Sequence, residues 1–561
     1  MVKWFFSWKG LIVHRRCIFF MIQIQQIKME PDHTKERLEK KILSVLRIRQ
    51  EQLKEWKIAK CSIDARKKPL VKLVYSVWVE VVDEKSVMKR VENEKNITLV
   101  KKQNYQFPFF ENSQKETLTE RPIIIGSGPA GLFCGLFLAE YGYRPLILEQ
   151  GEDVDSRTHT VAVFWKEGIC NPFSNVQFGE GGAGTFSDGK LNTLVNDNCG
   201  RNQKVLEILV NAGAPKEILY WNKPHIGTDV LQKVVKGIRK QIEAYGGEVR
   251  FLSQVTDLEL ENKEGSTKVS AVIVNEKERI PCQTVILAIG HSARDTFFML
   301  ERKSLSMSAK AFAVGVRIEH PQKQIDFAQY GMEERKMLPA ADYKLTYKAS
   351  NGRSVYSFCM CPGGYVVNAS SEEGRLAVNG MSYSSRDGEN ANSAIIVSVT
   401  PEDFKEDSPL AGIAFQRQLE EAAYLAGKGK IPLQLFGDFV KNQKSEKFFH
   451  IKPNLKGDYC FANLKKVLPP AICDALEEGI VAFGKKISGF NRVDALLSGV
   501  ESRTSSPVRI WRDSGMESNI LGVYPCGEGA GYAGGITSAA MDGIKVAEAI
   551  AQKYAPFGRN I

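Results

Sequence analysis

Three glycines, Gly126, Gly128 and Gly131, follow a run of three isoleucines and open an apolar helical pattern. A second apolar run comes next along the chain and ends on Glu149. The first glycine permits a tight turn, the second lets the backbone approach a pyrophosphate, and the third lets a helix pack closely on a strand. An acid at the end of the second strand can accept hydrogen bonds from a ribose. The spacing therefore predicts a dinucleotide-binding βαβ unit.

Two later segments distinguish between the dinucleotides that such a unit could hold. Residues 284–290 read as a buried strand that ends on a glycine, and residues 522–540 read as a strand, a glycine-rich turn and a helix. A helix that begins near Gly534 has free N–H groups and the positive end of its dipole at its first turn. Those groups could stabilise negative charge on a reduced flavin. The alternative is a glycine cluster that serves only helix packing.

Both segments resemble the conserved elements of the glutathione-reductase-like FAD fold. In that fold, the first is the strand that ends beside the cofactor, and the second carries the acid that binds the ribityl chain. Glu528 stands where the fold usually has aspartate, and Ile289 stands where it usually has threonine. The resemblance favours FAD over NAD.

A third segment, residues 175–191, is too rich in glycine to form a regular element. Its place after the second Rossmann strand predicts a loop around the pyrophosphate, the ribityl chain and the flavin. It does not follow a strand and open a helix, so it is not a second nucleotide fingerprint. A flexible surface loop is the alternative.

These motifs and several others resemble those of the bacterial and plastid FAD-dependent dehydrogenases of unassigned substrate, over about residues 21–551. The matching segments are residues 62–67, 126–131, 175–191, 355–364, 386–394, 500–509 and 527–536. The resemblance implies bound FAD and a redox role, and it implies no particular substrate.

The fingerprint and the resemblance together give an expected set of cofactor-binding residues. The set is Gly126, Gly128, Pro129, Ala130, Gly131, Glu149, Gln150, Arg157, Gly181, Gly182, Thr185, Val255, Gly290, Gly527, Glu528, Gly534, Gly535 and Ile536.

The expected fold is α/β: a Rossmann-type FAD-binding domain, an inserted mixed α+β substrate domain and a small N-terminal α+β domain. The expected boundaries are 1–20 for a non-native or unstructured extension, 21–118 for the N-terminal module and linker, 119–305 and 500–561 for the two parts of the FAD-binding domain, and 306–499 for the insertion. In the module, strands at residues 22–27, 56–63 and 71–82 accompany a helix that Asp32 or Thr34 would cap, whereas residues 83–120 read as a linker.

The first twenty residues mix aromatic and basic side chains and lack both an unbroken apolar core and a small-residue cleavage site. An extended gene start, with Met21 as the initiator, is the simplest interpretation. A membrane-surface or organelle-targeting segment is the alternative. No stretch of the chain approaches the ~20 apolar residues of a membrane span.

The bulk composition, 43% hydrophobic and 25% charged over 561 residues, is that of a globular protein. An odd count of 11 cysteines at irregular spacings argues against a disulfide framework and for a reducing compartment. We therefore expect a cytoplasmic location, or a plastid in a photosynthetic eukaryote. No CxxC occurs and the seven histidines are scattered, so we expect no metal site.

The positive charge lies at the N-terminal end: residues 1–120 hold 25 Lys and Arg against 15 Asp and Glu. A solvated surface explains such an imbalance, and a weak nucleic-acid contact through the N-terminal module is the alternative.

The catalytic residues are not evident from the sequence. Cys359 and Cys361 are the closest pair of cysteines, and they could form a redox pair or supply a nucleophile. Strand alternation would place both on one face, which favours packing or the lining of a substrate cavity. Cys170 lies nearer the position of a redox disulfide in flavin disulfide reductases, but no partner lies near it in the sequence.

Three further side chains are weaker candidates. Lys190 and Arg503 could hold an anionic substrate, a cofactor phosphate or a salt bridge. His291, just after Gly290, could act as an acid, although a turn residue is the simpler interpretation.

The function that follows is a FAD-dependent oxidoreductase that transfers a hydride or electrons through flavin N5. Only one dinucleotide fingerprint exists, so the sequence contains no dedicated NAD(P)H domain. The electrons could come from the substrate, from NAD(P)H bound at the flavin face, or from a protein donor. The alternatives are a flavoprotein that binds RNA and a redox sensor or scaffold that holds FAD without turnover.

Overall fold

The computed structural model describes most of the chain, and the chain falls into two compact units. The described residues are 20–101, 104–108, 115–263, 265–335 and 337–556. The first unit comprises Met1–Asp64 and Lys72–Asn104, and the second comprises Ala65–Val71 and Tyr105–Ile561. Residues 1–19 of the expected extension lie outside the described residues.

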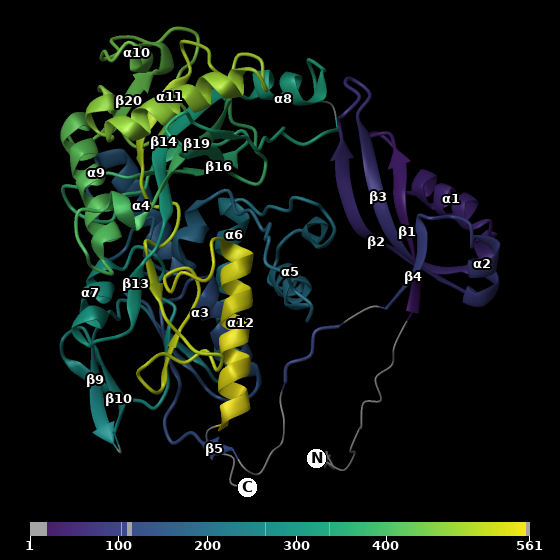
Figure 1. Ribbon diagram of the computed structural model, residues 1–561. Coiled ribbons are helices and arrows are strands. Elements are labelled where there is room, and N and C mark those ends of the chain that lie inside the picture. Colours follow the sequence, from purple (N-terminus) through teal and green to yellow (C-terminus); the bar gives the residue numbers. More distant parts are fainter. Residues whose placement is uncertain (1–19, 102–103, 109–114, 264, 336, 557–561) are drawn as a thin grey trace, which may run out of the picture. The chain divides into compact units, whose positions relative to one another are not determined.

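The first unit is an antiparallel sheet in the order β2-β3-β1-β4 with two helices, shown in purple in Figure 1. Its elements are β1 (Phe20–Met29), α1 (Lys35–Leu46), β2 (Leu53–Asp64), β3 (Lys72–Val81), α2 (Glu84–Arg90) and β4 (Ile97–Lys101). This order of elements is the β-α-β-β-α-β arrangement of split βαβ folds. Thr34, not Asp32, caps α1, because its side chain accepts a hydrogen bond from the backbone of Arg37.

The prediction of a linker over residues 83–102 was wrong, because α2 and β4 complete this module. The Asp83 carboxylate accepts a hydrogen bond from the N–H of Ser86 at 3.1 Å and so caps α2. Val87 and Ile97 are buried in the module. Charged residues surround these few apolar positions in the sequence, and they concealed the pattern.

The described part of residues 104–120 is not a free linker either. The Tyr105 hydroxyl donates a hydrogen bond to the Glu548 carboxylate at 2.7 Å. β5 (Glu116–Thr117) pairs in parallel with β26 (Tyr554–Ala555). This segment therefore packs against the C-terminal end of the second unit.

A parallel sheet in the order β25-β12-β6-β7-β8 forms the centre of the second unit. Its strands are β6 (Ile123–Ile125), β7 (Leu146–Leu148), β8 (Glu248–Arg250), β12 (Val285–Leu287) and β25 (Val523–Pro525). Alternate residues point to opposite faces. Ile124 and Ile286 join one apolar core, and Ile123 and Val285 join the other.

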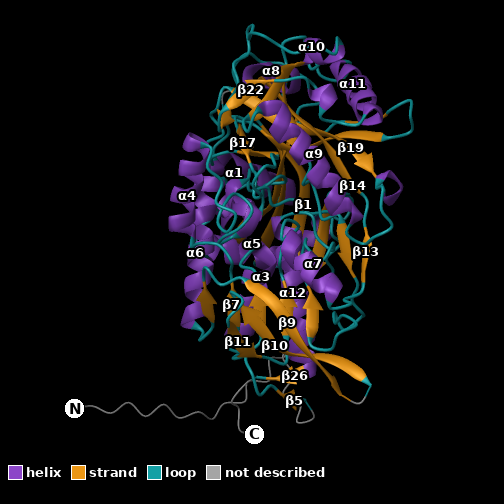
Figure 2. Cartoon of the chain, turned by 90° about the vertical axis from the view of Figure 1, so that its left-hand side faces the viewer, coloured by secondary structure: helices purple, strands orange, loops and turns teal. Residues whose placement is uncertain are grey.

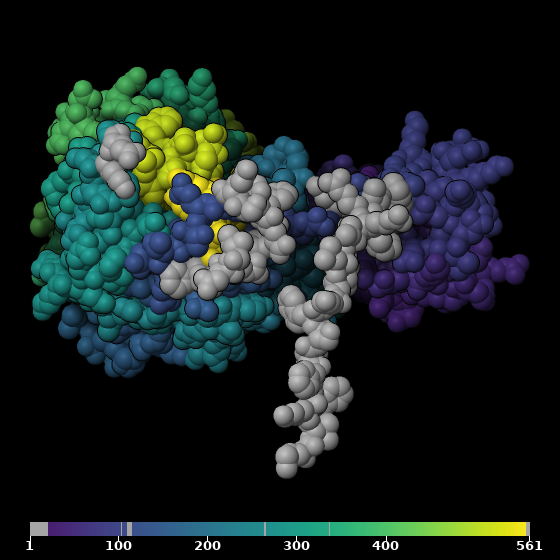
Figure 3. All heavy atoms as spheres, turned by 90° about the horizontal axis from the view of Figure 1, so that it is seen from below, coloured from purple at the N-terminus to yellow at the C-terminus, as the bar shows by residue number. Residues whose placement is uncertain are grey.

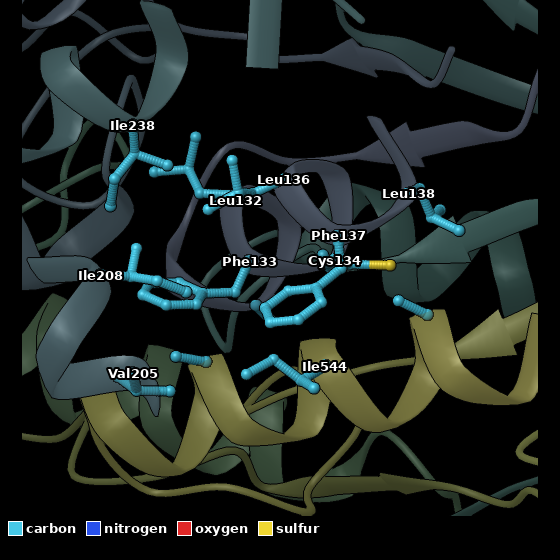
Figure 4. Close-up of a cluster of buried hydrophobic side chains, with 14 of the residues drawn as sticks. Leu132, Phe133, Cys134, Leu136, Phe137, Leu138, Val205, Ile208, Ile238 and Ile544 are labelled. Carbon is cyan, nitrogen blue, oxygen red and sulfur yellow. The ribbon is translucent and has the colours of Figure 1, made fainter. Parts of the chain in front are cut away.

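Helices cover one face of this sheet and a three-stranded antiparallel sheet covers the other. The helices are α3 (Pro129–Glu140), α5 (Arg201–Asn211), α6 (Thr228–Ala244) and α12 (Ile536–Lys553), and the strands are β9 (Val255–Lys263), β10 (Ser266–Val274) and β11 (Glu278–Pro281). Figure 4 shows Phe133 and Phe137 of α3 packed with Ile208 of α5 and Ile544 of α12. The predicted return of the chain to the Rossmann sheet is confirmed, and the C-terminal segment (yellow) lies among earlier segments in Figure 3.

The inserted part is a second sheet, in the order β15-β16-β19-β14-β23-β20-β22, with helices packed around it (Figure 2). Its strands are β14 (Phe312–Pro321), β15 (Thr346–Lys348), β16 (Ser354–Cys361), β19 (Asn390–Val399), β20 (Ile431–Leu435), β22 (Tyr459–Phe461) and β23 (Leu496–Glu501), and its longer helices are α9 (Ala411–Gly427) and α11 (Pro470–Gly484). β13 (Met307–Ala309), at the start of the expected insertion, pairs with β24 (Val508–Ile510), just after its end. The two ends of the insertion therefore lie side by side, and the architecture is the α/β fold expected from the sequence.

Candidate functional site

The turn between β6 and α3 explains the fingerprint glycines. Gly126 has a φ of +102°, and a Cβ there would lie 2.5 Å from the carbonyl oxygen of Ala288 on the neighbouring strand. A Cβ on Gly131 would lie 1.9 Å from the Gly126 carbonyl oxygen. The tight turn and the close packing expected of these two glycines are present in the structure.

Gly128 differs from the other two, because no steric conflict within the protein requires a glycine there. It is the N-cap of α3, its φ is −73°, and a Cβ would meet only Gly182 Cα at 3.9 Å. Gly128 borders the cavity described below. Its expected role beside a pyrophosphate stays a prediction.

Glu149 lies at the carboxyl end of β7 and connects three segments. One carboxylate oxygen accepts hydrogen bonds from the N–H and hydroxyl of Ser127, at 2.9 and 2.8 Å. The other accepts from the N–H groups of Gly151 and Gly179, at 3.0 and 2.9 Å. Glu149 therefore fixes the fingerprint turn to the glycine-rich segment, and a ribose hydroxyl would have to share oxygens that already accept four hydrogen bonds.

Arg157 of α4 (Val154–Glu167) holds the glycine-rich segment in place. Its fully buried guanidinium donates to five carbonyl oxygens at 2.8–3.1 Å. They belong to Asn175, Val176, Gly179, Glu180 and Gly182. Burial lowers the pKa of Arg157 to about 10, which leaves it charged at neutral pH.

The fingerprint turn, the glycine-rich segment and the C-terminal element enclose one cavity of about 350 Å³. It lies where β6, β12 and β25 end, because Gly126, Ala288 and Cys526 all border it. In open α/β sheets, ligands bind outside the carboxyl ends of the strands.

Most of the expected cofactor-binding residues line this cavity. They are Gly126, Gly128, Pro129, Ala130, Glu149, Gln150, Gly182, Val255, Gly290, Glu528, Gly534, Gly535 and Ile536. Five others do not line it: Gly131, Arg157, Gly181, Thr185 and Gly527. Arg157 is one of these five, and its contacts shape the segment that borders the cavity.

The cavity wall leaves room for a ring system beside the first turn of α12. A Cβ added to Gly290, Gly534 or Gly535 would meet no atom within 4 Å. Gly535 is the N-cap of the 18-residue helix α12, so the N–H groups of the first turn face this open space. The absence of side chains at three places on the cavity wall fits a large planar group better than a packed protein core.

Glu528 lies in the glycine turn after β25 and lines the same cavity. Burial raises the pKa of its carboxyl to about 7, with the charge of Lys310 acting in the opposite direction. A carboxyl at this point can therefore donate or accept a hydrogen bond with a polyol chain near neutral pH.

Arg503 lines the cavity, but its charge is matched by a buried partner. Its guanidinium donates to both oxygens of Glu420, at 2.9 and 2.8 Å, and Arg294 does so as well at 2.8 Å. Burial opposes ionisation of Glu420, yet these two arginines hold its pKa far below the usual range. Arg503 is therefore part of an ion-pair network that joins the inserted domain to the Rossmann part.

His291 also lines the cavity, and burial lowers its pKa to about 4, so it is neutral at pH 7. Its Nε2 lies 3.0 Å from the Arg503 carbonyl oxygen, and its Nδ1 lies 3.0 Å from the Ser292 hydroxyl. These contacts agree with a role in ordering the turn.

Of the other candidates, Lys190 and Cys359 line the cavity, while Cys361 and Cys170 do not. Sequence reasoning did not select the inserted-domain residues that complete the wall, namely Phe358, Asn379, Glu501 and Thr504. One indication of these wall residues was present in the sequence, because Glu501 is an acid in the segment 500–509 that carries the family resemblance. The structure shows that Glu501 is buried.

Within the described ranges, no group of three His, Cys, Asp or Glu side chains is arranged to hold a metal ion. Likewise, none of the helices described is both long and apolar enough to cross a membrane.

Three family profiles match separate parts of the chain. Residues 311–504 match "FAD-dependent protein, C-terminal domain-like", residues 124–176 match "NAD(P)-binding Rossmann-like domain", and residues 21–80 match a domain of unknown function, DUF8436. The fold and site thus define a FAD-dependent protein with a Rossmann-like domain.

An uncharacterized protein of Clostridium beijerinckii is 51% identical over 538 residues, which cover 95% of this chain and 99% of that protein. The chain belongs to the same family. Among solved structures, L-proline dehydrogenase from P. horikoshii is 12% identical with a TM-score of 0.34, covering 79% of this chain and 96% of that one. CtdE in complex with FAD is 10% identical with a TM-score of 0.33, covering 77% and 84%.

Two glycine variants should separate the cofactor contact from the fold. Gly128→Ala should leave the urea unfolding midpoint of the FAD-free protein unchanged, because its Cβ meets no close atom. It should weaken FAD binding about tenfold or more, since the methyl group would block hydrogen bonds to a charged phosphate.

Gly131→Ala is the matched control. It should destabilise the FAD-free protein by about 1–3 kcal/mol, the usual cost of overpacking. FAD affinity is measured by fluorescence titration of the refolded protein. A Gly128→Ala protein that binds FAD as tightly as the native chain would contradict the assignment.

Proposed function

We propose that this protein is a FAD-dependent oxidoreductase whose flavin lies in the cavity at the carboxyl ends of β6, β12 and β25. The observation that carries the proposal is the convergence of four separate chain segments on this one cavity. The fingerprint turn, the glycine-rich segment, the loop after β12 and the start of α12 all border it.

Each segment supports a different part of the cofactor. The N-terminus of α3, with Gly128 as its cap, suits the pyrophosphate. Glu149, Gln150 and Glu528 all line the cavity, and we assign the first two to the adenosine end and Glu528 to the ribityl chain. The open space at Gly534 and Gly535 suits the flavin ring, where the first-turn N–H groups of α12 would stabilise negative charge.

Bound FAD would supply hydride or single-electron transfer at flavin N5. The protein supplies the position of the ring and the electrostatics around it. On the side of the inserted domain, the wall includes Phe358, Cys359, Asn379 and Glu501, and we place the substrate there. Since the sequence has one dinucleotide fingerprint, NAD(P)H as a donor would bind at the flavin face.

The test is the visible absorbance spectrum of the purified protein, followed by anaerobic titration with NADH and NADPH separately. We expect flavin absorbance, either as purified or after reconstitution with FAD, and bleaching by a reduced donor. A protein that stays colourless after reconstitution would overturn the proposal. A flavin that no acceptor reoxidises faster than buffer would instead indicate a sensor or scaffold.

A second function, contact with nucleic acid through the first unit, is favoured by the open face of its sheet. Trp78 lies at the centre of a cross-strand row, opposite Lys57 on β2 and Gln23 on β1. Its neighbours Val77 and Val79 are fully buried, so alternation turns Trp78 to the other face. Four-stranded sheets in this topology bind single-stranded RNA by stacking bases on aromatic side chains.

A filter-binding assay with tRNA at low salt tests this contact, because electrostatic binding is strongest there. The affinity for tRNA should fall at least about tenfold in Trp78→Ala, because a base stacked on an aromatic side chain contributes ~1–3 kcal/mol. Trp511→Ala, which removes a tryptophan that is 54% exposed outside this module, should have no effect. Absence of retention by the native chain would exclude the contact.

A further inference from the structure

A pair of cysteines forms part of the cavity on the side of the inserted domain. Cys359 lines the cavity, whereas Cys361 is fully buried behind it, and both are free thiols. β16 carries a bulge between Phe358 and Cys361, and Cys359 has a φ of +41°. The bulge interrupts the strand alternation that would have placed both thiols on one face, and bulges beside active sites re-aim side chains in this way.

A buried arginine places positive charge beside this pair of cysteines. Arg317 of β14 is fully buried, and its Nη1 donates to the Cys359 carbonyl oxygen at 3.1 Å and lies 3.8 Å from Cys361 Sγ. Its Nε donates to Glu501 at 2.8 Å, and Nη1 also donates to Asn392 at 2.6 Å. These partners hold the guanidinium in a single position.

The two thiols differ in acidity. A hydrogen bond from the Cys361 thiol lowers the pKa of Cys359, and the charges of Arg317 and Lys190 lower it further against the effect of burial. Burial and the neighbouring Cys359 raise the pKa of Cys361, and they outweigh the charge of Arg317, which lowers it. One sulfur is thus favoured as a thiolate and the other as a thiol.

Two carboxylates also face the pair, and both are matched by cations. Asp188 opposes ionisation of Cys359, but it pairs with Arg386 and lies 3.6 Å from Lys190. Glu501 pairs with Arg317. The net field at Cys359 therefore remains favourable to a thiolate.

We propose that Cys359 and Cys361 form a dithiol–disulfide site for a small disulfide substrate that enters the cavity. Cys359, which lines the cavity, and Cys361, which is buried next to it in the strand, match an attacking and a resolving thiol. A cavity of about 350 Å³ suits a small molecule. The proposal deepens the proposed function by naming a substrate class for the same cavity.

The reaction balances without another reactant. The Cys359 thiolate attacks one sulfur of the disulfide RSSR, the S–S bond breaks, and RS⁻ leaves. The Cys361 thiol then attacks Cys359 Sγ in the mixed disulfide, the second RS group leaves, and the Cys361 proton passes to it. Two thiols of the protein are oxidised to a disulfide, and RSSR is reduced to one RS⁻ and one RSH.

The chain provides a matched control in Cys199, which is exposed. An ordinary exposed thiol reacts slowly below neutral pH because little of it is thiolate. Cys134, Cys282 and Cys526 are buried, and burial raises the pKa of each of these thiols.

The test is the reaction of the full-length, FAD-loaded protein with 2,2′-dipyridyl disulfide at about pH 5.5, well below the usual thiol pKa. Pyridinethione release is followed in a stopped-flow instrument, and peptide mass spectrometry locates the products. In the native chain, this pair should release two pyridinethiones and yield a Cys359–Cys361 disulfide. Cys361→Ser should release one and retain a mixed disulfide on Cys359, at a rate at least about tenfold above that of Cys199.

Cys359→Ser should abolish the fast release and leave Cys361 unmodified. A Cys359 that reacts no faster than Cys199, in the native chain or in Cys361→Ser, would overturn the proposal. If a variant fails to fold, the rate of Cys359 modification and the disulfide product in the native chain still test the proposal. The flavin spectrum is read separately, so failure of the thiol site and failure of FAD binding are distinguishable.

Discussion

Five carbonyl oxygens that point inward around one guanidinium are the constraint on which the site depends. The segment from Asn175 to Gly182 contains neither strand nor α-helix, so its carbonyl groups have no ladder to satisfy them. Arg157 donates to five of them at once, and those of Gly179 and Glu180 also accept from the Gly182 N–H and the Thr185 hydroxyl. A buried carbonyl left without a donor would cost about 1–3 kcal/mol. Glu149 joins the same segment to the fingerprint turn through Ser127 and Gly179. Two buried charges thereby give a glycine-rich chain a single shape.

The inserted domain completes the cavity because both of its ends are anchored at the Rossmann part. β13 and β24 pair where the chain leaves and returns, and Glu420 binds Arg294 and Arg503 across the same junction. The inserted sheet can therefore present Cys359 and Glu501 to the cavity from a fixed position. The inserted sheet thus adds side chains to a wall that the Rossmann part forms with glycines and with Lys190, His291 and Glu528.

Much of this arrangement follows from local sequence patterns. Glycines at a strand-to-helix turn are needed where a side chain would clash with the backbone. A Cβ on Gly126 or Gly131 would lie too close to a carbonyl oxygen. The bulge at Cys359 and the contacts of Arg317 depend on strands that are distant in sequence, so no local spacing predicts them. Arg157 was selected as a cofactor ligand, yet it contacts the protein backbone, because a buried arginine suits carbonyl oxygens as well as phosphate. The module's α2 and β4 were missed because their few apolar anchors lie among charges.

Hydrogen exchange followed by mass spectrometry, on the FAD-free and FAD-loaded protein, tests the central claim that this cavity holds the cofactor. The account predicts slower exchange on loading in residues 126–131, 179–189, 288–293 and 527–536, the segments that carry most of the glycines lining the cavity. It predicts unchanged exchange in the strands β1 to β4 of the first unit. Protection that is absent from these four segments, or that falls elsewhere in the chain, would contradict it.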